Sequence, residues 1–430
     1  MRRYQILAQP DYPSFMTLFL TVISSFFYMG NFYLLSVAAK DYAKHLDLPA
    51  SFSGLLTGLN WAAAVVFAFV YSFWSNYQFK IPVVICAFIV ALGNLLYFIA
   101  WDADLAILLF VGRLLIGVGG PRVINRRYIA VYVAVKARTK WNAFYVAGSI
   151  LGMACGPFAA AGLFYADFTF MGLTVNGMNC PAFVMMVVWL IYGVMCIFFF
   201  EEPEIEKKKP ATTVQASDED EEVNSWLPTL MALWALFFPK LVQESFIVAA
   251  PIAADAAFGW NVSDVGIYLA VISFIVAPIH IVIGVTSSWI EDRQFIMFAK
   301  AICVVGALLL VDFGSMPMFQ YMVGSLILYF ATNIADPVST SLTSKVLPKK
   351  IAKGIFNAGM LATLAGSLGR AMGGVAVAVA GYWGSSALEN NLFIPLSILC
   401  LISAVVMKLA YPLMVPIDVG LSPKSTTKTS

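Results

Sequence analysis

Charged residues are scarce in this sequence of 430 residues, at 12% of positions, whereas hydrophobic residues make up 61%. Soluble domains carry about 25% charged residues. So little charge leaves too little polar surface to face water, which excludes a single soluble core, and the apolar content excludes a disordered chain. The apolar residues form long continuous runs, which excludes a membrane β-barrel with its short alternating segments. An all-α membrane protein with many spans is the class that remains.

Histidine and cysteine are also scarce, with two and six residues. The cysteines form no C-x-x-C pair, and only Cys180 falls in an expected non-cytoplasmic loop, so neither a disulfide framework nor a zinc site is predicted. The sequence contains no phosphate-cradling loop, no convergent nucleophile and base, and no large basic patch. We therefore predict no enzymatic activity, no cofactor or metal, and no nucleic-acid partner.

Twelve apolar runs are long enough for a spanning helix, which needs about 20 mostly apolar residues. We place them at 14–38, 51–75, 81–101, 104–131, 139–165, 181–200, 226–252, 263–285, 294–312, 318–342, 353–381 and 392–413. Segment 201–225 is charged and poor in apolar residues, which predicts a disordered linker. It divides the chain into an N-terminal six-helix half (1–200) and a C-terminal six-helix half (226–413), followed by a tail (414–430).

Lysine and arginine are distributed unevenly among the expected loops. If the N-terminus is cytoplasmic, the outer loops carry only Lys40 and Lys44, and every other loop cation faces the cytoplasm. Because positively charged loops stay on the cytoplasmic side, we expect both termini, the linker and the tail to be cytoplasmic.

Eight cations lie within or at the edges of the expected spans, namely Arg113, Arg122, Arg126, Arg127, Lys240, Lys300, Arg370 and Lys408. Only Glu244 and Asp336 sit as acids well inside spans. A charge deep in the bilayer costs at least about 2.5–3.5 kcal/mol, so it normally pairs or faces a wet cavity. We expect Lys300 and Lys408 to reach an interface. For the other cations, the excess of positive charge predicts a bound anion.

The fourth span, 104–131, carries four of these arginines. On one continuous helix, Arg122 and Arg126 lie about 40° apart and share a face, and Arg113 and Arg127 share another. One pair is expected to line the transport pathway and the other to anchor the structure.

Pro121 lies beside the arginines of the fourth span and is expected to loosen its helix and free a carbonyl nearby. On the seventh span, Lys240 and Glu244 lie four residues apart and can pair with each other. That pair is either structural or a switch that an anion or a proton opens.

Short motifs mark two spans of the N-terminal half and one loop in each half. The fourth span contains GRLLIGVGG (112–120), with Arg113, and the fifth contains GSILGMACGP (148–157), with Gly152, Gly156 and Pro157. The loop after the second span reads SNYQFK (75–80), with Asn76 where an acid is usual, and the loop after the eighth reads EDRQ (291–294), with Asp292 and Arg293. In this order the motifs resemble those of the major facilitator superfamily. The resemblance implies twelve transmembrane helices in two six-helix halves, and a monomer.

A narrower resemblance covers nearly the whole chain. The runs GRLLIGVGGPRVINRRYIA, LGMACGP, FPKLVQES, FGW, EDRQ and FNAGMLATLAGSLGR are similar to the membrane part of plant vacuolar phosphate transporters that join an SPX domain to a major facilitator domain. The lysosomal ceroid-lipofuscinosis membrane family is a more distant match. The resemblance implies a vacuolar or lysosomal membrane, with the plasma membrane as the alternative. The family positions that carry the same residue type here are Arg122, Arg126, Arg127, Lys240, Glu244 and Arg370.

We hypothesise that the chain moves inorganic phosphate, or a similar small anion, by alternating access. Arginine offers a planar fork to two oxygens and lysine adds a point charge. The substrate-binding candidates are Arg126, Arg127, Lys240, Arg370, Arg122, Tyr28 and Asn31. Arg126, alone or together with Arg127, would clamp the anion with Lys240 and Arg370 while one half rocks against the other.

The coupling or gating candidates are Glu244, Asp336 and His280. The two carboxylates would neutralise part of the cationic site when no substrate is bound, and either could carry a coupling proton. His280 titrates near neutrality, although it also fits a histidine packed at a helix interface. Two other functions stay open: a chloride or organic-anion transporter or channel of lysosomal type, and a non-transporting membrane receptor or scaffold.

Overall fold

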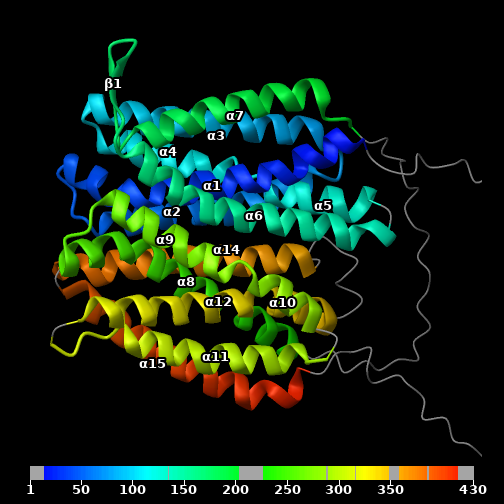
Figure 1. Cartoon of the computed structure of the whole chain (residues 1–430). Coiled ribbons are helices and arrows are strands. Elements are labelled where there is room, and N and C mark those ends of the chain that lie inside the picture. The colour runs from blue at the N-terminus through cyan, green and yellow to red at the C-terminus, as the bar shows by residue number, and fades with distance from the viewer. Residues whose placement is uncertain are drawn as a thin grey trace, which may run out of the picture. The chain divides into compact units, whose positions relative to one another are not determined.

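The structure is a computed structural model that describes residues 14–133, 135–202, 226–286, 289–314, 316–347, 358–384 and 387–414. These residues are almost entirely helical (Figure 1). The helices are α1 (Phe15–His45), α2 (Phe52–Trp74), α3 (Lys80–Ala103), α4 (Ala106–Val118), α5 (Arg122–Tyr132), α6 (Val135–Leu163), α7 (Cys180–Phe199), α8 (Leu227–Phe258), α9 (Val262–Val276), α10 (Ile279–Thr286), α11 (Asp292–Leu309), α12 (Met318–Val346), α14 (Ala358–Ala380) and α15 (Leu388–Ala410), with short 3-10 turns at Gly381–Trp383 and Tyr411–Leu413. Ten of the described helical segments are long and apolar enough to cross a membrane. The predicted all-α membrane class is therefore confirmed.

The fourth predicted span is interrupted. Its helix α4 ends at Val118, and α5 begins at Arg122 after Gly119–Pro121. Proline cannot donate the backbone hydrogen bond that a continuous helix needs there. The predicted span is present, since Ala106–Ile129 is long and apolar enough to cross a membrane. Its helix is interrupted at Pro121, so the expectation that Arg113 and Arg127 share one helical face was wrong.

The eighth predicted span, 263–285, is interrupted in the same way. Helix α9 ends at Val276, and α10 begins at Ile279 directly after Pro278. Both breaks lie at prolines, which lack the backbone donor of a continuous helix. Pro157, Pro337 and Pro395 lie inside α6, α12 and α15 without ending them, so a proline permits such a break but does not by itself cause one.

The chain forms two compact units. Unit 1 consists of Met1–Thr212, Ile247–Ala277 and Gly374–Leu388, and unit 2 consists of Thr213–Phe246, Pro278–Gly373 and Glu389–Ser430. Helices α8 and α14 contribute residues to both units. The division into halves at 1–200 and 226–413 stays a prediction.

Helices α1 and α6 of unit 1 pack with their backbones in close approach. A Cβ atom at Gly152 would lie 2.9 Å from the backbone nitrogen of Gly30, and one at Gly156 would lie 2.8 Å from the Gly30 carbonyl oxygen. Small residues permit this approach between membrane helices. Pro157 lies inside α6, and its carbonyl faces Gly266 of α9 at a similarly short range. These motif residues therefore serve packing.

The two lysines predicted for an outer loop lie instead on the last turns of α1, which extends to His45. Lys40 is 3% exposed, and its Nζ lies 3.0 Å from Asp255 Oδ2 of α8. Lys44 Nζ lies 3.2 Å from the same oxygen. Within unit 1, this carboxylate therefore joins α1 to the end of α8.

A β-hairpin connects α6 to α7 in unit 1, where the sequence suggested only a loop. Strand β1 (Asp167–Phe170) pairs antiparallel with β2 (Leu173–Asn176). The turn residues Met171 and Gly172 have φ angles of 52° and 83°, as the common two-residue hairpin turn requires. Met171 is 88% exposed. Figure 1 shows the hairpin near the left-hand ends of α3 and α7, where it points away to the side of these helices.

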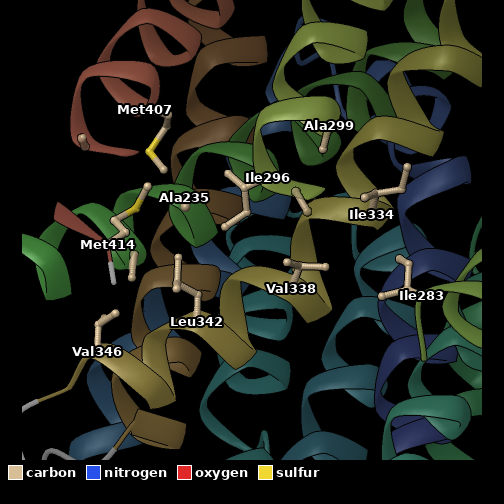
Figure 2. Close-up of a cluster of buried hydrophobic side chains, with 13 residues drawn as sticks. Ala235, Ile283, Ile296, Ala299, Ile334, Val338, Leu342, Val346, Met407 and Met414 are labelled. Atoms are coloured by element: carbon tan, nitrogen blue, oxygen red, sulfur yellow. The ribbon is translucent and has the colours of Figure 1, made fainter. Parts of the chain in front are cut away.

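Unit 2 is held together by an apolar cluster from α8, α10, α11, α12 and the C-terminal end of α15. Helix α12 contributes a stripe of residues four apart: Ile334, Val338, Leu342 and Val346 (Figure 2). Residues at this spacing lie on one face of a helix. The stripe packs α12 against its neighbours and fixes which of its residues point elsewhere.

The outer surfaces of the helices are apolar. Phe198, Phe319 and Leu409 are 74%, 78% and 73% exposed. Monomeric soluble proteins rarely expose so many large hydrophobic side chains. The surface therefore fits a lipid environment.

Candidate substrate site

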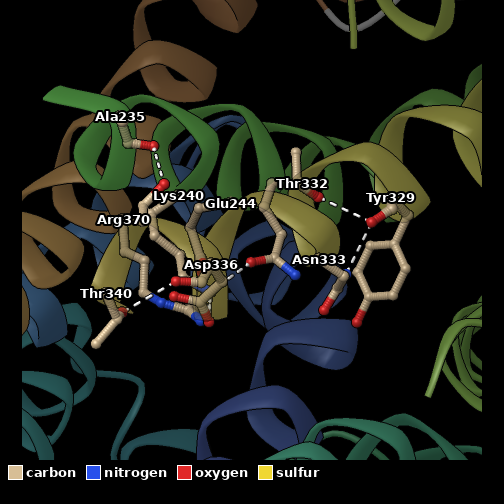
Figure 3. A network of polar contacts seen from close by, with 11 residues as sticks. Ala235, Lys240, Glu244, Tyr329, Thr332, Asn333, Asp336, Thr340 and Arg370 are labelled. Atoms are coloured by element: carbon tan, nitrogen blue, oxygen red, sulfur yellow. Dashed lines mark hydrogen bonds and ion pairs between the residues drawn. The ribbon is translucent and has the colours of Figure 1, made fainter. Parts of the chain in front are cut away.

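A network of charged and polar side chains connects α8, α12 and α14 inside unit 2 (Figure 3). Lys240 of α8 is 6% exposed, and its Nζ lies 2.7 Å from Asp336 Oδ2 of α12. The same ammonium donates a hydrogen bond of 3.1 Å to Gln243 Oε1. The Asp336 side chain is 37% exposed, so this pair is open on one side.

A second ion pair joins α14 to α8. Arg370 Nη1 donates to Glu244 Oε2 at 2.8 Å, and the two side chains are 3% and 0% exposed. Sequence spacing suggested that Lys240 and Glu244 pair with each other, but the structure gives each of them a partner from another helix. The network therefore consists of two cation–carboxylate pairs and is formally neutral.

Small residues on α14 bring Arg370 to this position. A Cβ atom at Gly373 would lie 2.6 Å from the Leu241 carbonyl oxygen and 2.9 Å from Glu244 Cβ. Gly369, one turn earlier, faces Lys240 Cβ in the same way. The two glycines let α14 approach α8 closely, and this places the guanidinium beside the carboxylate.

Asp336 is positioned by an irregular part of α12, because Pro337 follows it inside the helix. Nearby hydroxyl and amide groups bond to carbonyls of the same helix: Thr332 and Asn333 donate to the Tyr329 carbonyl, and Thr340 donates to the Asp336 carbonyl. Pro337 deprives the Asn333 carbonyl, four residues earlier, of its usual donor. The side-chain bonds to Tyr329 and Asp336 therefore add to the backbone bonds of α12 and do not replace the missing one.

The arginines of unit 1 lie against aromatic rings. Arg113 is fully buried, and its guanidinium carbon lies 5.9 Å and 5.3 Å from the ring centroids of Phe32 and Tyr97. This geometry is that of cation–π contacts. The environment fits the structural role that its motif predicted for Arg113.

The arginines of α5 point to three different neighbours. Arg122 lies 5.8 Å from the Trp61 ring centroid, and Arg126 lies 5.9 Å from that of Tyr145. Arg127 instead binds the end of α2. Arg122 and Arg126 are therefore each placed over an aromatic ring of unit 1.

Arg127 fastens the loop motif that follows α2. It donates to the Ser72 carbonyl at 2.7 Å and to Ser75 Oγ at 3.2 Å, and it also contacts Asn76 Oδ1. Arginine suits this task because its planar fork reaches several acceptors at once. Its described partners are those of an anchoring residue, although the sequence placed it among the substrate-binding candidates.

The corresponding loop motif in unit 2 is also bonded to its surroundings. Asp292 Oδ2 accepts from Lys345 Nζ at 2.7 Å and from Ser341 Oγ at 3.0 Å. Arg293 donates to Glu291 and lies 4.7 Å from the Tyr411 ring centroid. These contacts agree with the structural role that the motif predicted.

Two other candidates on α1 are buried. Tyr28 and Asn31 are 1% and 0% exposed and lie one helical turn apart. The side chain of His280, a gating candidate, lies outside the described residues.

Sequence reasoning missed several buried polar groups. Lys300, expected at an interface, is 2% exposed and donates to Ser403 Oγ at 2.9 Å, so that expectation was wrong. Lys408 is exposed, as expected. Asn60 of α2 is fully buried. A lone asparagine in an apolar run was the available signal, because a buried amide needs hydrogen-bond partners.

Comparisons with known proteins agree with this architecture. The sequence profile described as Major Facilitator Superfamily matches residues 21–374. Two SPX domain-containing membrane proteins of Arabidopsis thaliana are each 31% identical to the chain, over 91% and 90% of its length. A relative of the same description from Oryza sativa is 30% identical over 91% of the chain. The chain spans 63% of the length of these relatives.

Solved structures share the fold. A bacterial homologue of the human lysosomal transporter Spinster, in an inward-facing and occupied conformation, has a TM-score of 0.70 at 17% identity, covering 95% of this chain and 97% of that one. A D-xylose-proton symporter has a TM-score of 0.69 at 13% identity, covering 91% and 97%. The chain therefore belongs to the Major Facilitator Superfamily, as a multi-pass membrane transporter and not an enzyme.

Proposed function

We propose that the chain transports inorganic phosphate, or a similarly small anion, across an endomembrane by alternating access. The observation that carries the proposal is a pair of buried cations held by carboxylates, in the contacts Lys240–Asp336 and Arg370–Glu244, at 2.7 Å and 2.8 Å. Charges inside membrane spans are costly and mark substrate or ion pathways. The resemblance to plant SPX-type transporters supports phosphate as the anion and a vacuolar or lysosomal membrane.

The two carboxylates hold the cations while no anion is bound. A phosphate oxygen that approaches Lys240 competes with Asp336 for the ammonium, and the planar fork of Arg370 can exchange Glu244 for two phosphate oxygens. Such an exchange keeps each buried cation compensated throughout, which avoids the cost of an isolated buried charge. That Arg126 joins Lys240 and Arg370 at one anion stays a prediction.

Asp336 is the better candidate for a coupling proton. Its side chain is 37% exposed, whereas that of Glu244 is completely buried. A proton that reaches Asp336 removes its negative charge and frees Lys240 for the anion. We propose proton coupling of this kind for a monomer whose termini are both cytoplasmic.

Uptake of labelled phosphate into proteoliposomes tests the function. Saturable uptake that unlabelled phosphate blocks, and that chloride, sulfate and carboxylates block weakly, is the expected result. Arg370→Gln should abolish uptake, and Lys408→Gln, which removes an exposed cation of the same unit, should retain it. Chloride current without phosphate flux would refute the phosphate assignment in favour of a chloride pathway. Absence of any flux would favour a receptor or scaffold.

A further inference from the structure

The interruption of the fourth span leaves a helix end inside unit 1. Helix α5 begins at Arg122, and Pro121 before it provides no side-chain cap. The first helical bond of α5 runs from the Asn125 N–H to the Pro121 carbonyl. The N–H groups of the preceding residues, 122–124, therefore have no acceptor within their own helix. The N-terminus of an eleven-residue helix carries a partial positive charge and attracts anions.

Two buried polar side chains face this break. The Tyr28 hydroxyl lies so close to Gly120 that a Cβ atom there would be 2.8 Å from the oxygen. Asn60 lies beside Tyr28, and Arg122 also lies near the phenol. Helix α2 passes so close to the end of α4 that the carbonyl of Asn60 would collide with any side chain at Gly117. Both polar side chains therefore lie where the helix of the fourth span is interrupted.

The polar atoms of these side chains have few hydrogen-bond partners. Within the part of the chain that the structure describes, the Tyr28 hydroxyl and the Asn60 amide interact with each other and have no further hydrogen-bond partner. Tyr28 is 1% exposed and Asn60 is 0% exposed. Burying a polar group whose hydrogen-bonding capacity is not fully used is unfavourable. Two buried polar side chains that have only each other as partners, beside one helix end, keep hydrogen-bonding capacity for a polar ligand.

The α4–α5 break is accessible to a small ligand. The guanidinium of Arg122 lies over the Trp61 ring, which also packs edge-on against Tyr28 at 6.2 Å between centroids. Arg122 and Gly120 are both partly exposed, so the break is not sealed within unit 1. A small anion could reach it and find a cation, a phenol and backbone donors together.

We propose that the α4–α5 break is an oxyanion subsite, in which the first N–H groups of α5, Arg122 and the Tyr28 hydroxyl donate to the anion, and Asn60 selects its protonation state. The Asn60 amide offers a donor and an acceptor. Its carbonyl oxygen can accept a hydrogen bond from the P–OH group of hydrogen phosphate. Sulfate and chloride offer no such proton at neutral pH. The subsite therefore favours phosphate over both. This inference rests on the proposed anion transport and adds the groups that choose the anion.

Binding and uptake measurements on four proteins test the subsite: wild type, Tyr28→Phe, Asn60→Leu and the control Tyr42→Phe. Tyr42 lies on the same helix and is also buried, but its hydroxyl donates to the Tyr97 carbonyl. Binding is measured as the rise in melting temperature that inorganic phosphate or sulfate produces in detergent, because a ligand stabilises the state that it binds. Uptake is measured with labelled phosphate in proteoliposomes.

Tyr28→Phe should weaken phosphate binding and raise KM for phosphate about tenfold, since a hydrogen bond to a charged group is lost. Asn60→Leu should lose the preference for phosphate over sulfate. Tyr42→Phe should behave like the wild type in both assays. Wild-type values for Tyr28→Phe and Asn60→Leu, with phosphate uptake intact, would overturn the subsite and leave the proposed function standing. If the wild type neither binds nor takes up phosphate, the proposed function fails, and the subsite fails with it.

Discussion

The two ion pairs of unit 2 should differ sharply in what they contribute to stability. We compare Glu244→Gln, which leaves the buried Arg370 without its carboxylate, with Asp336→Asn, which does the same to Lys240. Glu244 and Arg370 are 0% and 3% exposed, whereas the Asp336 side chain is 37% exposed and Lys240 also donates to Gln243. Both substitutions preserve side-chain shape, so charge is the main change.

Burial sets the expected magnitudes. Removing one partner of a buried ion pair costs about 3–5 kcal/mol, because the other charge stays buried without compensation. An exposed pair contributes about 0–1 kcal/mol, and the open side of Asp336 lets water solvate Lys240. At roughly 2–4 °C per kcal/mol, Glu244→Gln should lower the melting temperature by roughly 6–20 °C. Asp336→Asn should lower it by no more than roughly 4 °C.

Thermal unfolding of purified protein in detergent, followed by tryptophan fluorescence, measures the difference. The double variant Glu244→Gln/Arg370→Gln should regain part of the lost stability, because it removes the stranded charge as well. Glu291→Gln provides the control for an exposed pair, since the Glu291 side chain is 57% exposed beside Arg293. Equal losses for Glu244→Gln and Asp336→Asn, or no recovery in the double variant, would refute the assignment of burial as the cause.

Three further predictions concern packing, the loop motif and the thiols. Gly152→Val should cost about 1–3 kcal/mol or more through overpacking of α1 against α6, measured as lower yield and melting temperature. Asn76→Asp should stabilise the protein by about 1 kcal/mol and so raise its melting temperature, because the contact with Arg127 becomes an ion pair. Cys303 and Cys400, whose sulfurs lie 3.6 Å apart, should form a disulfide under a membrane-permeant oxidant, detected as a cross-linked peptide by mass spectrometry.

Each of these has a matched control. Gly162→Val changes the same helix where nothing lies within 4 Å, so it should be tolerated. Asn76→Asp combined with Arg127→Gln should lose the gain, and a gain that persists would contradict the proposed contact. Cys303→Ser should abolish the cross-link, and a cross-link that survives would show that other cysteines react.

The helical membrane architecture was predictable because hydropathy is a local property of the sequence. Apolar runs of sufficient length reveal spanning helices wherever they occur. The interruption at Gly119–Pro121 was predicted only in part. Pro121 indicated a weakened helix, but the sequence did not indicate two separate helices. A proline inside a span can bend a helix or end it, and neighbouring side chains decide between these outcomes.

Partners of buried charges were the part that the sequence could not supply. Helical spacing put Glu244 within reach of Lys240, but Arg370, 126 residues away, is the partner in the structure. Lys300 likewise finds Ser403 on another helix. Hydropathy indicates how deep a residue lies in a span, whereas tertiary packing determines which side chains it contacts.

The β-hairpin provides a site at which the orientation of the protein in the membrane can be measured. It precedes α7, and the linker follows the end of this helix at Phe199, so the two lie at opposite ends of one helix of 20 residues, about 30 Å long. That length matches the hydrocarbon core of a bilayer. An epitope inserted at the exposed turn beside Met171 and another in the linker should therefore be accessible from opposite compartments of a sealed vesicle. Antibody binding to one epitope and protection of the other would read the orientation of the whole transporter directly.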